Sequence, residues 1–150
     1  QIFISMKKVM LSLVLLFALA PCLKAQTTDK LIVEVNGLKN NKGMLVLDIF
    51  NSGKGFPMET KHALKRLIVK PENGQGRFVI ENLPQGTYAL AVVHDENQSG
   101  TLDTNVLGMP KEDACALQNA KGFLGPPHFE DAKFSWPQNQ KKMVITMLYF

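Results

Sequence analysis

Cysteine is scarce in this sequence, and the predicted mature protein cannot form an internal disulfide. The chain holds two cysteines. Cys22 lies in a segment that we expect to be removed, which leaves Cys115 alone. Small exported domains often depend on disulfides for their stability. This domain must instead depend on its apolar core, or on that core together with a bound metal.

A concentrated basic surface is also missing. The formal net charge of the whole chain is +4. Lys7, Lys8 and Lys24 leave with the leader and no acidic residue does, which lowers the charge of the mature chain to +1. The remaining lysines are scattered singly, so no electrostatic footprint for a polyanion is present. We therefore expect no nucleic-acid partner.

The familiar catalytic motifs are absent as well. The sequence has no Gly-x-Ser-x-Gly elbow, no His-Glu-x-x-His, no pair of nearby cysteines and no phosphate-binding loop. It also has no internal repeat and no low-complexity tract. No reaction is therefore indicated by a motif, and a catalytic residue is not predicted on this basis.

The N-terminal segment has the pattern of a secretory signal peptide. Met6–Lys8 supplies a short positive region, and Val9–Ala20 is an apolar run. That run is shorter than the roughly 20 residues that a helix needs to cross the bilayer, and Pro21 follows it. We expect no transmembrane anchor after signal cleavage, and a secreted or periplasmic location in the cell envelope.

Cleavage is expected after Ala25. Residues 1–25 are then the signal peptide with its upstream residues, and residues 26–150 form one domain. Lipidation of Cys22 is an alternative, but the residue before it is Pro21 rather than the small residue that such a site requires. We therefore favour a mature chain without a lipid on Cys22.

The mature chain has the pattern of an all-β protein. Short runs rich in Val, Ile, Leu, Phe and Tyr recur between Gly, Asn and Pro residues, which is typical of strands joined by tight turns. The strands are predicted at Leu31–Leu38, Met44–Phe50, Leu64–Lys70, Arg77–Leu83, Thr87–His94, Phe129–Trp136 and Met143–Phe150. The fold class is therefore a seven-stranded, largely antiparallel β-sandwich with a long ordered loop after the fifth strand.

Alternation within two of these strands predicts the core. Phe78 and Ile80 share one face of the fourth strand, and Tyr88, Leu90 and Val92 share one face of the fifth. Tyr88 follows a Gly-containing turn, which is the arrangement that lets a tyrosine hydroxyl bond back to a nearby backbone group in a tyrosine corner. We expect Tyr88 to be buried and structural.

The segment after the fifth strand resembles the first part of a calcium-binding loop. Oxygen-bearing side chains occur at every second position, and Gly100 allows a sharp turn. The predicted metal ligands are Asp95, Asn97, Ser99, the carbonyl of Thr101 and Asp103. Calcium is the hard, oxygen-binding cation that such a set fits, so Ca²⁺ is the predicted cofactor.

The match to a calcium loop is partial. Val106 stands where an EF-hand has its bidentate Glu, so an affinity in the roughly 10⁻⁴ to 10⁻³ M class is expected. The alternative is a turn that caps itself through local hydrogen bonds from side chains to the backbone. The sequence leaves both interpretations open.

The residues from Val106 to Phe129 show no strong strand or helix pattern. Loops of this length in compact domains are often functional. Lys111, Glu112, Phe123 and His128 are accordingly candidates for lining a surface site, while packing over the end of the sandwich is the competing explanation.

Several ordered motifs carry a family resemblance. They are Leu83-Pro84-x-Gly86-Thr87-Tyr88-Ala89, His94-Asp95-Glu96-Asn97, Leu102-Asp103-Thr104-Asn105, Gly108-Met109-Pro110-Lys111-Glu112 and Gly125-Pro126-Pro127-x-Phe129-Glu130-Asp131-Ala132. The chain resembles the secreted bacterial proteins catalogued as domain of unknown function 2141. The resemblance implies an exported immunoglobulin-like sandwich similar to transthyretin-like and carboxypeptidase-regulatory modules, and it brings no catalytic residues. The sequence departs from the usual Gly-Asn at Gln98-Ser99.

Two functions follow from these patterns. The first is a non-enzymatic envelope module, stabilised by calcium, that binds an envelope glycan or an envelope protein. The second is an enzyme in which His94 and Asp95, with His128, act as acid and base or as metal ligands. A structural role for His94 competes with the second, because no nucleophile or further ligand lies at a diagnostic spacing.

Overall fold

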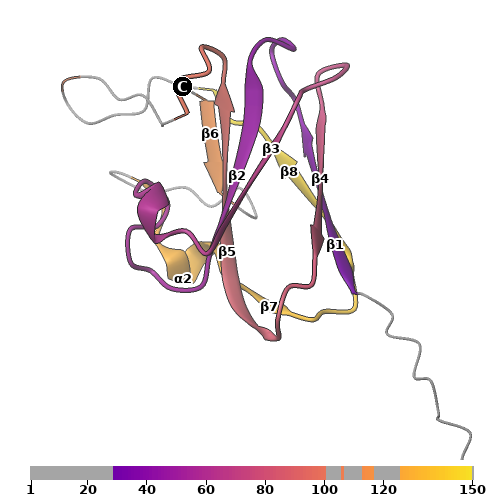
Figure 1. The fold of residues 1–150 in the computed structure, drawn as a ribbon, viewed down its shortest axis with the longest axis vertical. Coiled ribbons are helices and arrows are strands. Elements are labelled where there is room, and N and C mark those ends of the chain that lie inside the picture. The colour runs from indigo at the N-terminus through magenta and orange to yellow at the C-terminus, as the bar shows by residue number, and fades with distance from the viewer. Residues whose placement is uncertain (1–28, 101–105, 107–112, 117–125, 150) are drawn as a thin grey trace, which may run out of the picture.

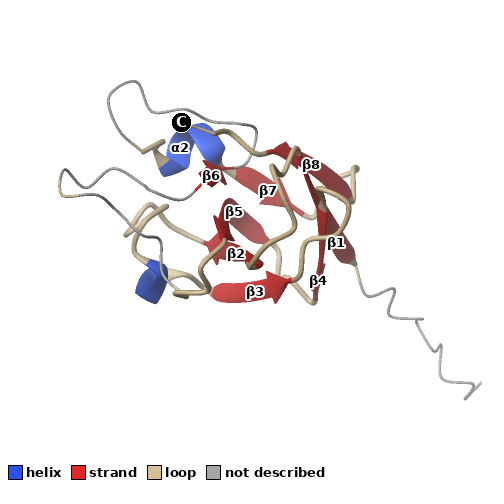
Figure 2. Ribbon diagram, turned by 90° about the horizontal axis from the view of Figure 1, so that it is seen from above, coloured by secondary structure: helices blue, strands red, loops and turns tan. Residues whose placement is uncertain are grey.

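The computed structural model describes residues 29–100, 106, 113–116 and 126–149. The predicted signal peptide, Cys22, Thr101 and Asp103 lie outside these residues. The described part is nearly all β, with two mostly antiparallel sheets packed as a sandwich (Figures 1 and 2). The predicted fold class is confirmed.

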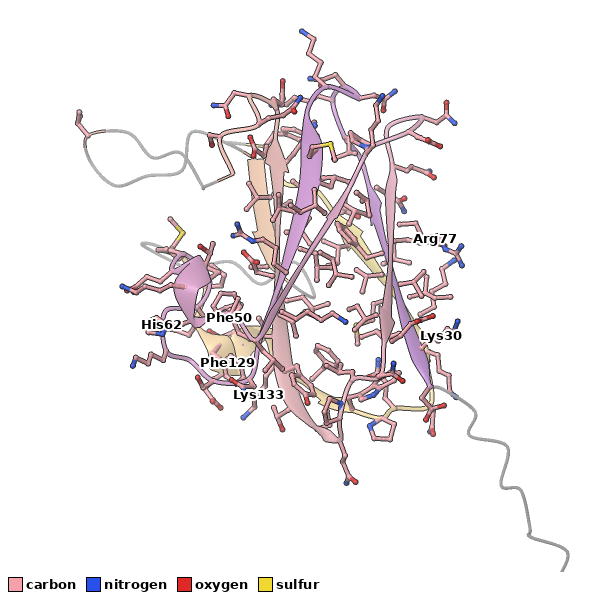
Figure 3. All side chains as sticks on the ribbon, viewed as in Figure 1. Lys30, Phe50, His62, Arg77, Phe129 and Lys133 are labelled. Atoms are coloured by element: carbon pink, nitrogen blue, oxygen red, sulfur yellow. The ribbon has the colours of Figure 1, made fainter. Side chains whose placement is uncertain are left out.

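One sheet has three strands in the order β4-β1-β8. These are β1 (Lys30–Asn36), β4 (Gly76–Glu81) and β8 (Lys142–Thr146). β1 pairs with β4 in antiparallel register and with β8 in parallel register. Every second residue of β1 and β4 is buried, as the alternation of the sequence predicts. The other face of this sheet carries charged side chains, including Lys30 and Arg77 in Figure 3.

The second sheet has the order β3-β2-β5-β6, and β7 pairs with the first part of β5. Its strands are β2 (Met44–Phe50), β3 (Lys65–Val69), β5 (Gly86–Asp95), β6 (Asp113–Ala116) and β7 (Phe134–Trp136). β2 occupies the centre, hydrogen-bonded to β3 on one side and to β5 on the other. The eight described strands are one more than the sequence predicted.

The additional strand is β6, which lies within the stretch expected to be a loop. Its sequence, Asp-Ala-Cys-Ala, contains no β-branched or aromatic residue, so it gave no strand pattern. The backbone instead pairs with the free edge of β5, where Cys115 lies opposite Val92. Edge pairing of this kind follows from the tertiary fold and not from local sequence preference.

The strand predicted at 129–136 is in fact two elements. Phe129–Ala132 forms the short helix α2, and only the last three residues form β7. Helix formation places Phe129 against Phe56, with ring centroids 5.9 Å apart, and Phe56 contacts Phe50 at 5.3 Å. Packing of these rings, which the sequence pattern does not encode, favours the helix, and Phe56 and Phe129 become partly buried. Figure 3 labels Phe50 and Phe129.

These aromatic residues cover the outer face of the second sheet. We use "outer face" for the side of the β3-β2-β5-β6 sheet that points away from the three-stranded sheet. In Figure 2, α2 and the 3-10 turn η1 (Thr60–His62) lie on this side. β2 is consequently buried on both faces from Leu45 to Phe50. A continuous apolar run is typical of a strand covered on both sides.

The core between the two sheets contains the residues that the alternation predicted. Phe78, Ile80, Tyr88, Leu90 and Val92 are all buried in one cluster. The Tyr88 hydroxyl donates a hydrogen bond to the Pro84 carbonyl oxygen at 2.9 Å. The predicted tyrosine corner is therefore present.

We expect Tyr88→Phe to lower the free energy of unfolding by about 1 kcal/mol, because the variant loses one hydrogen bond and leaves the Pro84 carbonyl without its donor. Chemical denaturation measures this change. Tyr149→Phe is the control, since that hydroxyl lies at the periphery and accepts from the Lys39 amide. An unchanged denaturation midpoint in Tyr88→Phe would contradict a stabilising corner.

Candidate functional site

β5 ends at Asp95, whose side chain lies on the outer face of the second sheet. Side chains alternate along a strand, so Asp95 and Val93 point outward while His94 points to the opposite face. Asp95 is only 3% exposed. Its two carboxylate oxygens accept hydrogen bonds from the backbone amides of Ser99 at 3.0 Å and Gly100 at 2.8 Å.

The loop curls around this carboxylate. The Asn97 side-chain oxygen also accepts from the Ser99 amide, at 2.8 Å. Gln98 and Gly100 have φ values of 59° and 76°, in the left-handed region that allows a sharp turn. The predicted ligands Asp95 and Asn97 are thus brought to the same side of the loop.

These hydrogen bonds are of the kind expected for a self-capped turn. They leave calcium binding open, because each carboxylate or carboxamide oxygen has two lone pairs and the described bonds to Asp95 use one on each oxygen. Thr101 and Asp103, the last two predicted ligands, lie outside the described residues. Calcium binding at this loop therefore stays a prediction.

An ion pair between the buried Asp48 and the partly exposed Arg66 lies next to the loop. Asp48, in the middle of β2, lies directly opposite Arg66 of β3. The Arg66 Nε and Nη2 atoms donate to the two Asp48 carboxylate oxygens, each at 2.8 Å. Asp48 is 3% exposed, so its charge is compensated by this two-point contact rather than by water.

Arg66 also reaches the loop itself. Its Nη1 atom donates to the Gly100 carbonyl oxygen at 2.9 Å. The hydrogen bonds with Asp48 raise the pKa of the Arg66 guanidinium; burial opposes this, and the charges of Asp48 and Asp95 add to the rise. The guanidinium is therefore a permanent cation beside the two carboxylates.

A small surface pocket lies over the Asp48–Arg66 ion pair and the Asp95 carboxylate. Asp48, Arg66, Asp95 and Gly100 line it, together with Pro57 and Thr60 from the 52–60 loop and two valines, Val46 and Val93. It brings together side chains from β2, β3 and β5 that are far apart in sequence. The pocket therefore lies between the predicted ion-binding loop and the Asp48–Arg66 ion pair.

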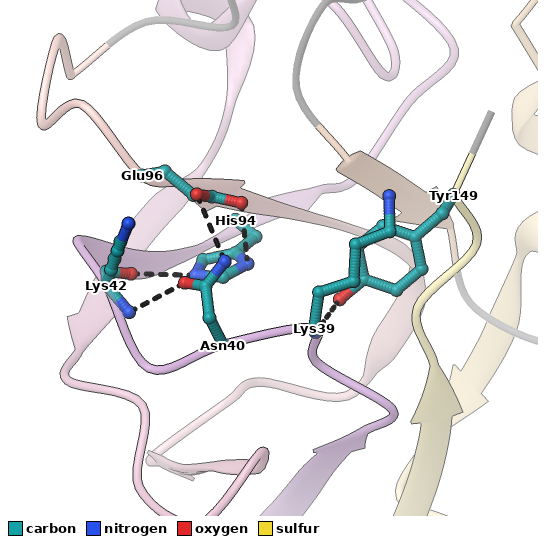
Figure 4. A network of polar contacts seen from close by, with 6 residues as sticks. All are labelled: Lys39, Asn40, Lys42, His94, Glu96 and Tyr149. Carbon is teal, nitrogen blue, oxygen red and sulfur yellow. Dashed lines mark hydrogen bonds and ion pairs between the residues drawn. The ribbon is translucent and has the colours of Figure 1, made fainter.

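His94 has a different environment. Its ring is fully buried, and Nε2 lies 2.8 Å from the Lys42 carbonyl oxygen (Figure 4). A carbonyl only accepts, so Nε2 carries the proton. Among the described residues Nδ1 has no hydrogen-bond partner, and the Glu96 Oε1 atom lies 4.0 Å from it. Asn40 in turn donates to Glu96 at 3.2 Å.

The residues of the enzyme hypothesis do not gather in the described structure. His94 and Asp95 occupy opposite faces of the sheet, and His128 precedes α2 as an exposed residue. Within the described ranges, no group of three His, Cys, Asp or Glu residues is placed to hold a metal. Lys111, Glu112 and Phe123 lie outside the described residues.

Comparison with known proteins places the chain in a family. The family described as "Uncharacterized protein conserved in bacteria (DUF2141)" matches residues 33–144. The chain belongs to DUF2141. This match extends from β1 into β8 and includes Asp48, Arg66 and the loop after β5, as the resemblance of the sequence motifs predicted. Neither the comparison with curated proteins nor that with solved structures found a match.

Two site residues of this DUF2141 protein were missed by the sequence analysis. Asp48 is the one charged residue within the apolar run from Met44 to Phe50. A charge in a strand buried on both faces requires a partner. A single charged residue within an apolar run could therefore have identified Asp48 from the sequence. Arg66 carries no such mark, because it lies among alternating exposed residues of β3.

The described part of the chain contains no helix that is long and apolar enough to cross a bilayer.

Proposed function

We propose that this protein is an exported, non-enzymatic module of the bacterial cell envelope, that calcium stabilises the loop starting at Asp95, and that the module binds an envelope glycan or protein. The main support is the alternating spacing of oxygen-bearing residues from Asp95 onward, together with a backbone that turns the Asp95 and Asn97 oxygens to one side of the loop. This curvature gathers oxygen atoms on one side of the loop, which is the arrangement that a hard cation requires. Ser99, Thr101 and Asp103 are the further proposed ligands.

The partner is proposed to bind at the end of the sandwich that carries this loop. The loop and the turn before β2 are joined there through Asn40, Lys42, His94 and Glu96 (Figure 4). Asn97, Ser99 and Gly100 are exposed beside them. A rigid polar surface of this kind suits recognition because little conformational entropy is lost on binding.

The enzyme alternative has weaker support. General acid–base catalysis needs a titratable side chain within hydrogen-bonding reach of the substrate. The buried His94 ring has no surface for such contact, and its neighbour Asp95 is directed to the other face of the sheet. A structural role for His94, joining β5 to the turn at Lys42, accounts for its one hydrogen bond.

Thermal melting with calcium tests the proposal. At a free calcium concentration about ten times the dissociation constant, binding adds about 1.4 kcal/mol of stability. We expect this to raise the melting temperature by roughly 5 °C for a domain of this size. Magnesium should have a smaller effect, because it demands a more rigid octahedral set of ligands.

Asp95→Ala should abolish the calcium-dependent rise in melting temperature while the strands remain folded on their own core. Asp131→Ala, at an exposed position in α2, is the matched control and should keep the full rise. If the wild-type protein shows no response to millimolar calcium, the loop is a self-capped turn and the calcium proposal is wrong.

A further inference from the structure

Gly100 is held by hydrogen bonds at both its backbone amide and its backbone carbonyl. Its amide donates to Asp95, and its carbonyl accepts from Arg66. The first contact lies within the loop, whereas the second ties the loop to β3, which is two strands away from β5 in the sheet. The position of Gly100 is therefore set by the sheet as well as by the loop's own hydrogen bonds.

The Arg66 side chain is itself fixed by Asp48. Two parallel hydrogen bonds leave the guanidinium plane little freedom to rotate. Asp48 is anchored in turn by its place in β2, between β3 and β5. A rigid chain of contacts thus runs from the centre of the sheet through Arg66 to the loop.

We propose that Arg66, braced by Asp48, is the positioning residue that fixes the loop around Asp95 against the outer face of the sheet. A positive charge can neutralise a carboxylate without a fixed geometry. The planar guanidinium of Arg66 does more, because it bonds Asp48 through two nitrogen atoms and Gly100 through the third. The expected effect of these Arg66 contacts, called the clamp below, on calcium affinity rests on the proposed function. Its effect on the loop does not.

Arg66→Lys separates position from charge. Lysine keeps the positive charge near Asp48 and Asp95 but cannot reproduce the three-point contact. We expect hydrogen exchange of the Gly100 amide to become about tenfold faster in this variant without calcium, as follows from the loss of roughly one charge-assisted hydrogen bond. We also expect calcium affinity to fall by up to about tenfold, because Arg66 fixes Gly100 and the Gly100 amide bonds the proposed ligand Asp95.

Arg77→Lys is the matched control. Arg77 is an exposed arginine of β4 on the three-stranded sheet, far from the loop in Figure 3. Neither the Gly100 exchange rate nor calcium affinity should change in it. NMR-detected exchange and calorimetric titration of the purified protein measure the two quantities.

A second variant keeps the test decisive if Arg66→Lys is poorly folded. Asp48→Leu combined with Arg66→Met replaces this ion pair by apolar side chains, a change that proteins often tolerate. It should reproduce the faster Gly100 exchange. Wild-type exchange rates in both folded variants would overturn the positioning role. Faster exchange in the variants of a protein that binds no calcium would support the clamp and refute only the calcium site.

Discussion

Replacing Arg66 with alanine is expected to lower the free energy of unfolding by about 2 to 3 kcal/mol. The substitution leaves the Asp48 carboxylate, which is 3% exposed, without its partner in the middle of β2. The loss is large because the buried Asp48 carboxylate then lacks both hydrogen bonds from Arg66, although the partly exposed position of Arg66 lets water replace some of that contact. Urea or guanidinium denaturation gives the value.

Substituting the two members of this pair should lower the free energy of unfolding by different amounts. The Arg66 side chain is 32% exposed against 4% for Asp48, so an orphaned guanidinium can turn toward water but an orphaned carboxylate cannot. Asp48→Ala should therefore destabilise less than Arg66→Ala. Equal losses, or a loss below about 1 kcal/mol in Arg66→Ala, would mean that water hydrates the Asp48 carboxylate once Arg66 is gone and would contradict this prediction.

Gly43→Ala is expected to destabilise the fold by about 3 kcal/mol. Gly43 has φ +66°, a conformation that costs other residues roughly 1 to 2 kcal/mol. A Cβ at this position would lie 2.5 Å from Glu96 Cα and closer still to the Asp95 carbonyl oxygen. Backbone atoms cannot move aside as a flexible side chain can, so overpacking adds to the conformational penalty.

The control for this substitution is Gly74→Ala. Gly74 has a similar φ of +73°, but the nearest atom to an added Cβ would be the Leu38 carbonyl oxygen at 3.4 Å, an ordinary contact. It should lose only the conformational part, about 1 kcal/mol. Because Gly43 touches the start of the Asp95 loop, Gly43→Ala should also speed hydrogen exchange of the Ser99 amide, whereas Gly74→Ala should not. The same stability loss in both variants would contradict the steric argument.

Those parts of the fold that depend on local pattern could be predicted from the sequence. β1 to β5 lie within a residue or two of their predicted ranges, because alternating or continuous apolar residues between turns define them. β8 ends at Thr146, earlier than the predicted Phe150. Tyr88 was predicted for the same reason, since its turn and its strand are adjacent in the chain. The family, too, was recognisable from ordered motifs.

The parts that depend on contacts between distant segments could not be predicted. β6 forms because β5 offers a free edge, and α2 forms because Phe129 packs on Phe56 from another loop. In the candidate site, Asp95 and Asn97 were found from their spacing within one loop. Arg66 joins them only because β3 lies beside β2, and sequence spacing contains no information about that neighbour.

The parallel pairing of β1 with β8 has a consequence for how the chain reaches its native state. β1 is the first described strand and lies in the middle of its sheet, yet one of its edges is completed only by β8, the last strand along the chain. A nascent polypeptide therefore carries an open β1 edge until β8 is available to pair with it. Closing so long a loop is slow compared with forming hairpins, and exposed edges invite pairing with other chains. Assistance by a chaperone would have its greatest effect in that interval.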